Sequence, residues 1–349
     1  MHTLDDFDFD LPEELIALRP VRPRQASRML VANGGIVDSA VSELPAFLRA
    51  GDLLVFNNTK VIPARLSGQR FRDSLHGSGV SNIEVNLIER MSEDTWMSLA
   101  KPAKRLKLGD VVRFAGLSAA VVSKNGGEVT LAFDQSGDAL ERAIEAIGAM
   151  PLPPYIAAKR PADARDMDDY QTVFATKTGA VAAPTASLHF DSDLLARLDN
   201  LGVKSTEVTL HVGAGTFLPV KVDNIEEHKM HSEWGEVSVT AARHINQTLK
   251  SGGRVIPVGT TALRLIETAA VGVGKIAPWV GDTDIFIRPG YEFKIADGLM
   301  TNFHLPKSTL MMLVAALIGY DEVKQIYAHA IDNGYRFFSY GDSSLLLKK

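Results

Sequence analysis

Apolar positions in the N-terminal part of the chain predict one buried strand close to a change of chain direction. Residues 52–57 form a short apolar run that ends at the pair Asn57-Asn58, and a run bounded by turn-forming residues is typical of a buried strand. Residues 61–66, which include Pro63, are expected to redirect the chain. The pattern of apolar and polar residues before residue 67 is typical of an α/β domain.

The pattern changes between residues 67 and 134, where short alternating runs recur with turn residues between them. The runs are residues 83–88, 95–99, 111–114, 119–122 and 129–133. Turn material at residues 108–110 and 124–127 separates several of them. Evenly spaced short strands with Gly, Asn and Asp turns predict a small antiparallel barrel or sandwich, inserted into a larger domain.

Strand-like and helix-like segments alternate in the second half of the chain. A helix is expected at residues 139–147, and the proline-rich residues 150–155 favour an extended connector. Strands are then expected at residues 205–211, 254–258 and 284–287, and helices at residues 191–198, 240–250, 261–268 and 308–318. This alternation predicts an α/β domain around a largely buried sheet.

Composition narrows the class of protein. The chain has 349 residues, of which 46% are hydrophobic, and no window approaches the roughly eighteen apolar residues of a membrane span. It has no cysteine, which excludes disulfides, thiolate nucleophiles and zinc–cysteine sites and fits a reducing cytosol. The acidic N-terminal residues lack the order of a signal peptide. A cytoplasmic protein without contact to a membrane is therefore expected.

The net charge does not decide whether the protein binds nucleic acid. The net charge of −5 argues against a protein that coats nucleic acid, although a local basic face is enough for a tRNA enzyme. Two basic clusters exist, and each is either such a face or ordinary solvated surface. They are Arg19, Arg22, Arg24 and Arg28 near the N-terminus, and Lys101, Lys104, Arg105 and Lys107 in the inserted segment.

Four loops have the small and polar residues of a ligand site. The predicted strand 205–211 leads into Gly213-Ala214-Gly215-Thr216, where glycines allow backbone amides to approach a ligand or simply form a tight turn. The third glycine of a dinucleotide fingerprint is missing and no helix follows. The other loops are residues 179–190, 258–264 and 301–308, the last of which ends in Ser308, a candidate helix N-cap. Loops after strands are where α/β domains usually build sites.

The histidines have structural and chemical interpretations. His189, His211 and His304 lie at strand or loop ends, where a lone histidine is more often a hydrogen-bonded structural group than a catalyst. His228, His231 and Glu233 imitate a metal-ligand cluster, but the stretch has no strong ligand signature and no metal is expected. No Gly-x-Ser-x-Gly elbow, P-loop or paired-carboxylate motif occurs, so hydrolase and kinase functions lack support.

Taken together, these stretches resemble one family, the S-adenosylmethionine:tRNA ribosyltransferase-isomerases of queuosine synthesis. The matching stretches are residues 6–16 with 27–28, 51–66, 101–105, 151–155, 170–174, 183–186, 210–217, 231–234, 301–306 and 335–342. They follow the family's order over nearly the whole chain. One departure is Ser187, where the family usually has glycine.

The resemblance implies a large, distorted barrel-like α/β domain with a mixed sheet, formed by residues 1–66 and 150–349. It implies that residues 67–149 form an inserted small antiparallel β-barrel. The implied reaction transfers and isomerises the ribosyl group of S-adenosylmethionine onto the aminomethyl-deazaguanine (preQ1) at the wobble position of tRNA. Epoxyqueuosine-tRNA, adenine and methionine are the products. S-adenosylmethionine is then a consumed co-substrate, and neither cofactor nor metal is expected.

That chemistry needs a base, donors to the leaving groups and contacts that hold both substrates. The candidates for proton transfer are His189, His211, His304 and Glu233. The candidates for substrate binding are Arg28, Asn57, Gly213, Gly215, Thr216, Thr260, Thr261, Arg264 and Arg336. Two other functions stay open, a methyltransferase that would release S-adenosylhomocysteine and a non-catalytic tRNA-binding module. The chain is expected to act as a monomer.

Overall fold

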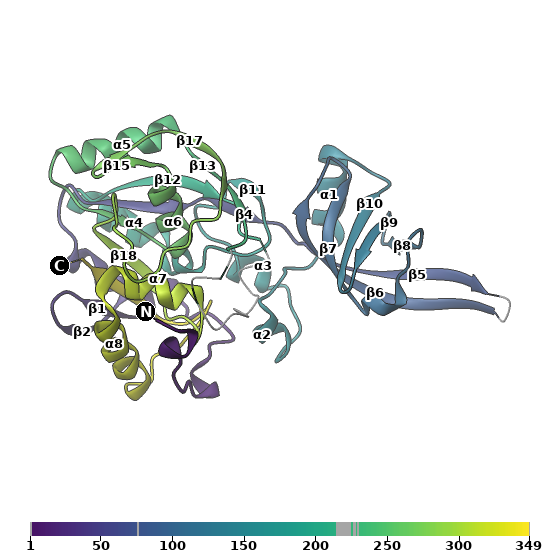
Figure 1. The fold of residues 1–349 in the computed structure, drawn as a ribbon, viewed down its shortest axis with the longest axis horizontal. Helices are drawn as coiled ribbons and strands as arrows, with labels where there is room; N and C mark the ends of the chain where they lie inside the picture. The colour runs from purple at the N-terminus through teal and green to yellow at the C-terminus, as the bar shows by residue number, and fades with distance from the viewer. Residues whose placement is uncertain (1, 75–76, 214–224, 226–227, 229, 349) are drawn as a thin grey trace. The chain divides into compact units, whose positions relative to one another are not determined.

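The computed structural model describes residues 2–74, 77–213, 225, 228 and 230–348 (Figure 1). The chain forms two compact units. One, called here the α/β unit, comprises Met1–Lys60, Asp168–Lys177 and Ala183–Lys349. The other, the barrel unit, comprises Val61–Met167 and Thr178–Ala182. Each unit is described by itself.

A five-stranded mixed sheet forms the centre of the α/β unit, in the order β14-β3-β12-β13-β17. Its strands are β3 (Leu53–Asn57), β12 (Lys204–Leu210), β13 (Glu233–Val237), β14 (Val255–Pro257) and β17 (Trp279–Thr283). Strand β3 is parallel to both β12 and β14, whereas β13 is antiparallel to β12. Every residue of β3 is buried, as expected of an apolar run in the middle of a parallel sheet.

A second sheet of the α/β unit has the order β18-β19-β1-β2. Its strands are β1 (Arg28–Ala32), β2 (Ile36–Ala40), β18 (Gly298–Asn302) and β19 (Ser343–Leu347). A parallel bridge between Val258 and Met300 joins the two sheets. Strands β3, β12, β14 and β18 therefore point the same way, and the loops that follow them meet at one edge.

The helices and short elements of the α/β unit begin and end where local signals predict. Ser308, Asp191 and Ser238 each cap a helix by accepting a hydrogen bond from a backbone amide of its first turn. The helices are α4 (Ser192–Leu201), α5 (Val239–Lys250), α6 (Thr260–Thr268), α7 (Thr309–Ile318) and α8 (Tyr320–Asp332). The short strands are β15 (Ala270–Gly272) and β16 (Lys275–Ile276), and the 3-10 turns are η1 (Leu4–Phe7), η2 (Glu13–Leu15), η3 (Arg24–Ala26), η4 (Val41–Phe47) and η6 (Thr185–His189).

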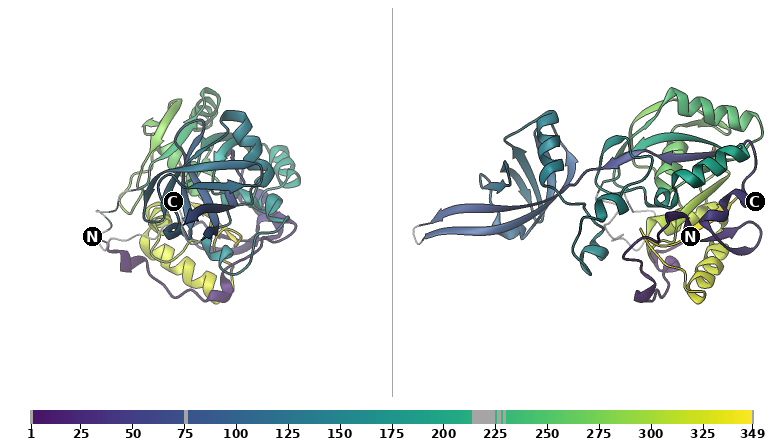
Figure 2. Two further views of the ribbon diagram at one scale, coloured as in Figure 1. Left: turned by 90° about the vertical axis from the view of Figure 1, so that its right-hand side faces the viewer. Right: turned by 180° about the vertical axis from the view of Figure 1, so that it is seen from behind.

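The barrel unit contains a closed antiparallel barrel in the order β10-β7-β6-β5-β8-β9. Its strands are β5 (Arg65–Ser74), β6 (Gly77–Arg90), β7 (Thr95–Lys101), β8 (Val111–Phe114), β9 (Leu117–Asn125) and β10 (Glu128–Phe133). Alternate residues such as Leu66, Ile83 and Val112 fill its core, as the period of two requires. The hairpin of β5 and β6 extends beyond the other strands (Figure 2). The remaining elements are η5 (Ala103–Arg105), α1 (Gly137–Ile147) and α2 (Pro154–Ala157).

Three short segments lie where the chain passes between the units. They are β4 (Thr59–Val61), α3 (Asp166–Asp169) and β11 (Lys177–Ala180). The predicted boundaries at residues 66 and 150 differ from the limits of the compact units, and the division into a domain of residues 1–66 and 150–349 and an inserted domain of residues 67–149 stays a prediction.

The predicted fold class, a mixed α/β fold with an inserted antiparallel barrel, is confirmed. Two local predictions are wrong. Residues 284–287 do not form a strand, because the pairing of β17 with β13 ends at Thr283 and Glu233. Residues 150–155 are not extended throughout, because α2 begins at Pro154, and proline is well suited to the first turn of a helix.

Candidate active site

Asn57 joins three elements at the edge where the parallel strands of the α/β unit end. Its Nδ2 donates to the carbonyl oxygen of Leu210 at 2.9 Å and lies 3.4 Å from Thr261 Oγ1. Its Oδ1 accepts from the backbone amides of Leu210 at 3.0 Å and Thr59 at 3.2 Å. The side chain predicted to bind substrate is therefore fully buried and holds the ends of β3 and β12 and the start of α6 together.

His211 follows directly on β12, and its ring is fixed on two sides. Its Nδ1 lies 2.8 Å from Thr59 Oγ1, and its ring stacks on Trp234 with the centroids 5.0 Å apart and an interplanar angle of 20°. Thr59 Oγ1 also lies 3.4 Å from the carbonyl oxygen of Lys177, to which it can only donate. We infer that the Thr59 hydroxyl accepts from Nδ1–H, so that Nε2 of His211 bears the lone pair. Burial lowers the pKa of His211, so the ring is neutral at pH 7.

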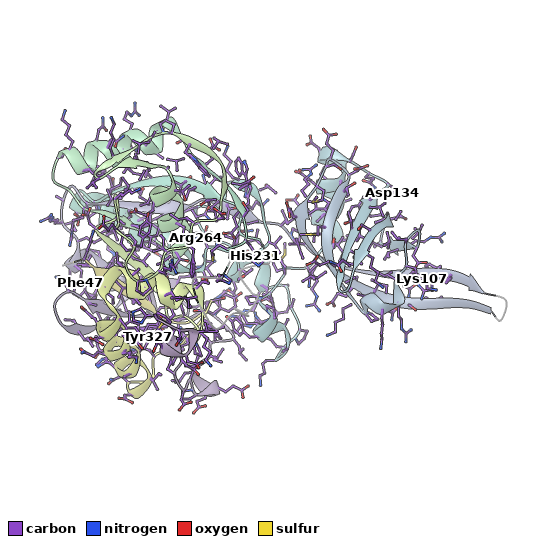
Figure 3. The ribbon with its side chains drawn as sticks, viewed as in Figure 1. Phe47, Lys107, Asp134, His231, Arg264 and Tyr327 are labelled. Carbon is purple, nitrogen blue, oxygen red and sulfur yellow. The ribbon has the colours of Figure 1, made fainter. Side chains whose placement is uncertain are left out.

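Glu233, at the start of β13, forms a buried ion pair with Arg264 of α6. Its Oε2 lies 2.5 Å from Arg264 Nη1, and its Oε1 accepts from the backbone amide of Gly213 at 3.3 Å. Arg264 Nε donates to the carbonyl oxygen of Ile285 at 3.3 Å, whereas its Nη2 is buried and has no hydrogen-bond partner among the described residues. Figure 3 labels Arg264 within the α/β unit. Both carboxylate oxygens of Glu233 are thus engaged.

The start of α6 lies beside the loop that contains η6. Gly259 precedes the helix with a φ of 93°, a left-handed conformation that favours glycine, and a Cβ placed there would lie 3.6 Å from Ala186 Cβ. The first backbone amides of α6, at Thr260 and Thr261, have no carbonyl partner within the helix. Such amides suit an anion or a polar ligand edge.

His189, the last residue of η6, is buried among charged and polar groups. The pKa of His189 is lowered to about 4, mainly by burial and also by Arg336 and Arg24, while Asp342 and Asn302 oppose the shift. Among the described residues, neither His189 Nε2 nor Asn302 Oδ1 has a partner with hydrogen-bond geometry. Arg336 is held by Asp342, with Nη2 3.1 Å from Oδ1. The structure therefore places the half-buried Arg336 near the buried His189, with Asp342 as the acidic group that interacts with both.

His304 follows β18 and makes structural contacts. Its Nε2 lies 3.1 Å from Thr301 Oγ1, and its backbone amide donates to the hydroxyl of Tyr327 at 3.0 Å. Burial lowers the pKa of His304 to about 3. The ring is neutral throughout the physiological pH range.

The side chain of Arg28 points away from these groups. Its guanidinium stacks on the ring of Tyr335 at 3.7 Å and donates to the carbonyl oxygen of Asn333 at 2.7 Å. Its Nη2 also lies 3.8 Å from a carboxylate oxygen of Asp38. Arg28 is thus occupied on another face of the α/β unit. The candidates Gly215 and Thr216 lie outside the described residues.

The other arginines of the N-terminal basic cluster are also bound within the α/β unit. Arg22 and Arg19 lie 2.5 and 3.7 Å from the carboxylate of Asp169. Arg24 donates to the carbonyl oxygens of Gln171 at 2.9 Å and Asp168 at 2.6 Å. These contacts hold the three side chains within the unit, while one carboxylate, that of Asp169, pairs with two of the arginines.

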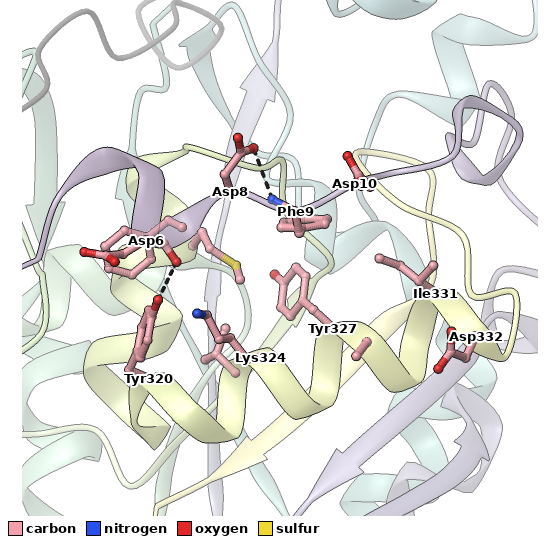
Figure 4. Close-up of a pocket in the computed structure, with 13 residues that line it drawn as sticks. Asp6, Asp8, Phe9, Asp10, Tyr320, Lys324, Tyr327, Ile331 and Asp332 are labelled. Atoms are coloured by element: carbon pink, nitrogen blue, oxygen red, sulfur yellow. Dashed lines mark hydrogen bonds between the residues drawn. The ribbon is translucent and has the colours of Figure 1, made fainter.

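A pocket of about 290 Å³ lies between the N-terminal segment and α8 (Figure 4). Tyr320 donates to the carbonyl oxygen of Asp6 at 2.7 Å across it, and the rings of Phe9 and Tyr327 meet edge to face. No predicted site residue lines this pocket. The strand edge therefore remains the better candidate site.

The described residues show neither a metal-ligand cluster nor a membrane-spanning helix. No group of three or more His, Cys, Asp or Glu among them is arranged to hold a metal ion. No helix within the described part of the chain is long and apolar enough to cross a membrane.

Comparison with known proteins decides the family. A family model described as queuosine biosynthesis protein matches residues 4–346. The chain belongs to this family. It is 62% identical over 350 residues to the S-adenosylmethionine:tRNA ribosyltransferase-isomerase of Dinoroseobacter shibae, and 60% identical over 346 residues to that of Ruegeria pomeroyi, with 99% of each chain covered in both cases. A crystal structure of the S-adenosylmethionine tRNA ribosyltransferase from Thermotoga maritima aligns with a TM-score of 0.55 and 36% identity, covering 98% of this chain and 100% of that one.

Sequence reasoning missed two side chains at the strand edge of this member of the queuosine biosynthesis family. Thr59 orients His211, and Trp234 stacks on it. Thr59 lies in the family stretch 51–66, between the pair Asn57-Asn58 and the predicted change of direction, and gave no chemical signal of its own. Trp234 lies in the family stretch 231–234 but gave no chemical signal of its own.

Proposed function

We propose that this chain is an S-adenosylmethionine:tRNA ribosyltransferase-isomerase. It transfers the ribosyl group of S-adenosylmethionine to the amine of preQ1 in tRNA, isomerises it, and releases adenine and methionine. Family membership supports this activity. The structural observation that supports its location is the oriented imidazole of His211, beside the glycine loop that follows β12.

His211 is the best candidate for the base that removes the proton from the ribose 5′ carbon beside the sulfonium. It is neutral, its Nδ1 is held by Thr59, and its Nε2 makes no hydrogen bond within the described part of the chain. His304 is less suitable, because Thr301 lies against its Nε2 and its pKa is only about 3. A weaker base removes a carbon-bound proton less readily.

His189 is better suited to contact a substrate than to accept the proton. The low pKa of about 4 makes it a weak base. Its unpartnered Nε2 and the nearby Asn302 Oδ1 together offer hydrogen-bonding atoms for the edge of a polar group such as a nucleobase. Arg336 positions this cluster through Asp342.

Glu233 and Arg264 are assigned to positioning rather than to proton transfer. The two carboxylate oxygens of Glu233 accept hydrogen bonds from Arg264 and from the backbone amide of Gly213. The free Nη2 of Arg264 suits a carboxylate, such as that of the methionine portion of S-adenosylmethionine. Thr260 and Thr261 add the amides at the start of α6.

Product analysis tests the activity. The protein is incubated with S-adenosylmethionine and tRNA that carries preQ1, and the small products are identified by mass. Free adenine and methionine in equal amounts, with epoxyqueuosine in the tRNA, are expected. S-adenosylhomocysteine in their place would identify a methyltransferase, and tRNA binding without any small product would identify a binding module.

The variant His211→Gln tests the assignment of the base. We expect the rate of adenine release to fall by on the order of 10²–10⁴-fold at saturating substrates. The matched control is His244→Gln, because His244 of α5 also meets a threonine hydroxyl through Nδ1, at 3.2 Å from Thr206. Equal rates for the two variants would remove His211 from the mechanism.

The remaining expectations concern the setting of the reaction. We propose that the enzyme acts as a monomer in the cytoplasm, with S-adenosylmethionine as a consumed co-substrate and without a metal. Unchanged adenine release after treatment with a chelator, and a concentration-independent mass in solution, are the expected results.

A further inference from the structure

Arg70 occupies an unusual position in the barrel unit. It lies on β5, opposite Ser81 of β6 and Val112 of β8, in the row of residues that faces the barrel core with Leu66. Only 7% of its surface is exposed. Its guanidinium is therefore buried at a position where neighbouring strands contribute apolar and small polar side chains.

The charge of Arg70 is not balanced within the described structure. Nη2 donates to Ser81 Oγ at 3.0 Å, while Nε is buried and has no hydrogen-bond partner there. No carboxylate forms an ion pair with Arg70 among the described residues, although its neighbour Arg72 has two hydrogen bonds to Asp110. Burying a charge without a counter-charge is unfavourable, so an anion at this position would be bound strongly.

A second guanidinium meets the same hydroxyl. Arg105, the last residue of η5, is exposed, and its Nη1 lies 3.3 Å from Ser81 Oγ. A serine oxygen that accepts from two arginines keeps its own proton to donate. Arg70, Arg105 and Ser81 thus form a group with donors and no free acceptor, which is the complement of a phosphate.

The segment around Arg105 contains more positive charge than one small anion would balance. The residues from 101 to 113 include the exposed side chains of Lys101, Lys104, Lys107 and Arg113 in addition to Arg105. The one acidic residue of this stretch, Asp110, is already bound by Arg72 and by the backbone amide of Lys107. Figure 3 labels Lys107 on this part of the barrel unit. Exposed cations on both sides of Arg105 in the sequence favour a polyanion as the partner.

We propose that Arg70, Ser81 and Arg105 bind a backbone phosphate of the tRNA, with the lysines of residues 101–107 contacting the neighbouring phosphates. This proposal rests on the proposed function, which supplies tRNA as the partner. It assigns RNA binding to the barrel unit and proton transfer to the α/β unit.

Equilibrium binding of preQ1-tRNA over a range of salt concentrations tests the proposal. Arg105→Gln is the first variant, because an exposed side chain can be changed without disturbing the barrel core. We expect roughly tenfold weaker binding and a salt slope that is reduced by about one, as for the loss of one phosphate contact. Arg142→Gln on α1 is the control, since it removes the same charge from an exposed position of the same unit, and it should leave the slope unchanged.

Arg70→Gln is the second variant, with its folding checked by thermal denaturation. It should weaken binding at least as much as Arg105→Gln, and the double variant should be less than additive because both side chains serve one phosphate. Wild-type affinity and slope for Arg105→Gln would overturn the proposal. Equal losses for Arg105→Gln and Arg142→Gln would also overturn it, since they would indicate a general effect of charge.

Inorganic phosphate distinguishes an RNA site from a site for a small anion. We expect millimolar phosphate, at constant ionic strength, to compete weakly with tRNA for the wild-type protein. Saturation of the site by phosphate with no change in tRNA affinity would contradict RNA binding there. Product analysis of the wild-type protein tests the proposed activity separately, because adenine release there does not depend on whether Arg105→Gln weakens tRNA binding. Failure of the phosphate site and failure of the proposed activity therefore give different results.

Discussion

The two units each contain a buried arginine, and the two side chains differ in their hydrogen-bonding partners. Arg264 in the α/β unit is 6% exposed and lies 2.5 Å from a carboxylate oxygen of Glu233. Arg70 in the barrel unit is 7% exposed, and among the described residues its side chain donates a hydrogen bond only to the hydroxyl of Ser81. The similar burial makes the difference in partners informative.

Arg264 has its counter-charge within the unit, whereas Arg70 has no carboxylate partner among the described residues. The ion pair of Arg264 fixes the loop after β12 through the contact of Glu233 with Gly213. Such a pair gives a site its geometry, although it adds little net stability. The lack of a carboxylate partner for Arg70 among the described residues fits the phosphate contact proposed for it.

Removing Arg264 should have the largest effect on stability. Arg264→Met removes the guanidinium that pairs with the buried carboxylate of Glu233, and we expect the free energy of unfolding to fall by roughly 3–5 kcal/mol. Urea denaturation at pH 7 measures it. The double variant Glu233→Leu with Arg264→Met removes both charges and should recover most of the loss. A loss below about 1 kcal/mol for the single variant would mean that Glu233 is satisfied without Arg264.

Lowering the pH should destabilise the α/β unit, because protonation would place positive charge on the buried histidines His189 and His304. His189 and His304 have pKa values of about 4 and 3, against about 6.5 in an unfolded chain. The unfolded state therefore binds more protons below pH 6.5, and stability is complete above that pH and falls as the pH drops towards 4. We expect each histidine to reduce the free energy of unfolding by about 2 kcal/mol between pH 7 and pH 5.

Denaturation of the wild type and His189→Gln at several pH values checks this expectation. The variant should lose stability less steeply over this range because one titrating group is gone. Parallel curves would show that His189 is not held neutral by burial.

Replacing Arg70 should act in the opposite direction to replacing Arg264. Arg70→Met removes a buried charge that has no carboxylate partner, and we expect a gain of roughly 1 kcal/mol in the free energy of unfolding together with weaker tRNA binding. Thermal and urea denaturation measure the first effect. A loss as large as that of Arg264→Met would show that Arg70 has a counter-charge within the fold.

Ser308 provides the smallest expected effect and a reference for polar residues with a purely structural role. Its Oγ accepts from the amide of Met311 at 3.2 Å and caps α7. Ser308→Ala should reduce the free energy of unfolding by roughly 0.5–1 kcal/mol and leave adenine release unchanged. Loss of turnover without loss of stability would reassign Ser308 to the site.

The sequence predicted the barrel better than the sheets of the α/β unit, for a physical reason. The alternation that faces Ile83 and Val112 into the barrel is local, and hairpins connect most of its strands. The sheet of β18, β19, β1 and β2 was not predicted, because β1 pairs with a strand more than 300 residues later, at Met29 and Ser343. Residues 284–287 look like a strand in isolation, but within the described part of the chain no strand pairs with them beyond Thr283.

The site was predicted in part. His211, Glu233, Arg264 and Asn57 lie at one edge because the parallel strands end there, as the loop positions suggested. Arg28 stays a prediction, and its side chain stacks on Tyr335 instead of joining this group. Arg70 gave no signal, because an arginine in an alternating strand is expected to face solvent, and its burial depends on closure of the barrel.

The most direct test of the account compares His211→Gln and Arg105→Gln side by side, with the rate of adenine release at saturating tRNA and the dissociation constant for tRNA measured for each. The account predicts opposite effects. His211→Gln should lose the rate by on the order of 10²-fold or more and keep wild-type tRNA affinity, whereas Arg105→Gln should keep the rate and lose affinity roughly tenfold. Wild-type rates for His211→Gln, or the same change in both quantities for both variants, would contradict the assignment of proton transfer to the α/β unit and RNA binding to the barrel unit.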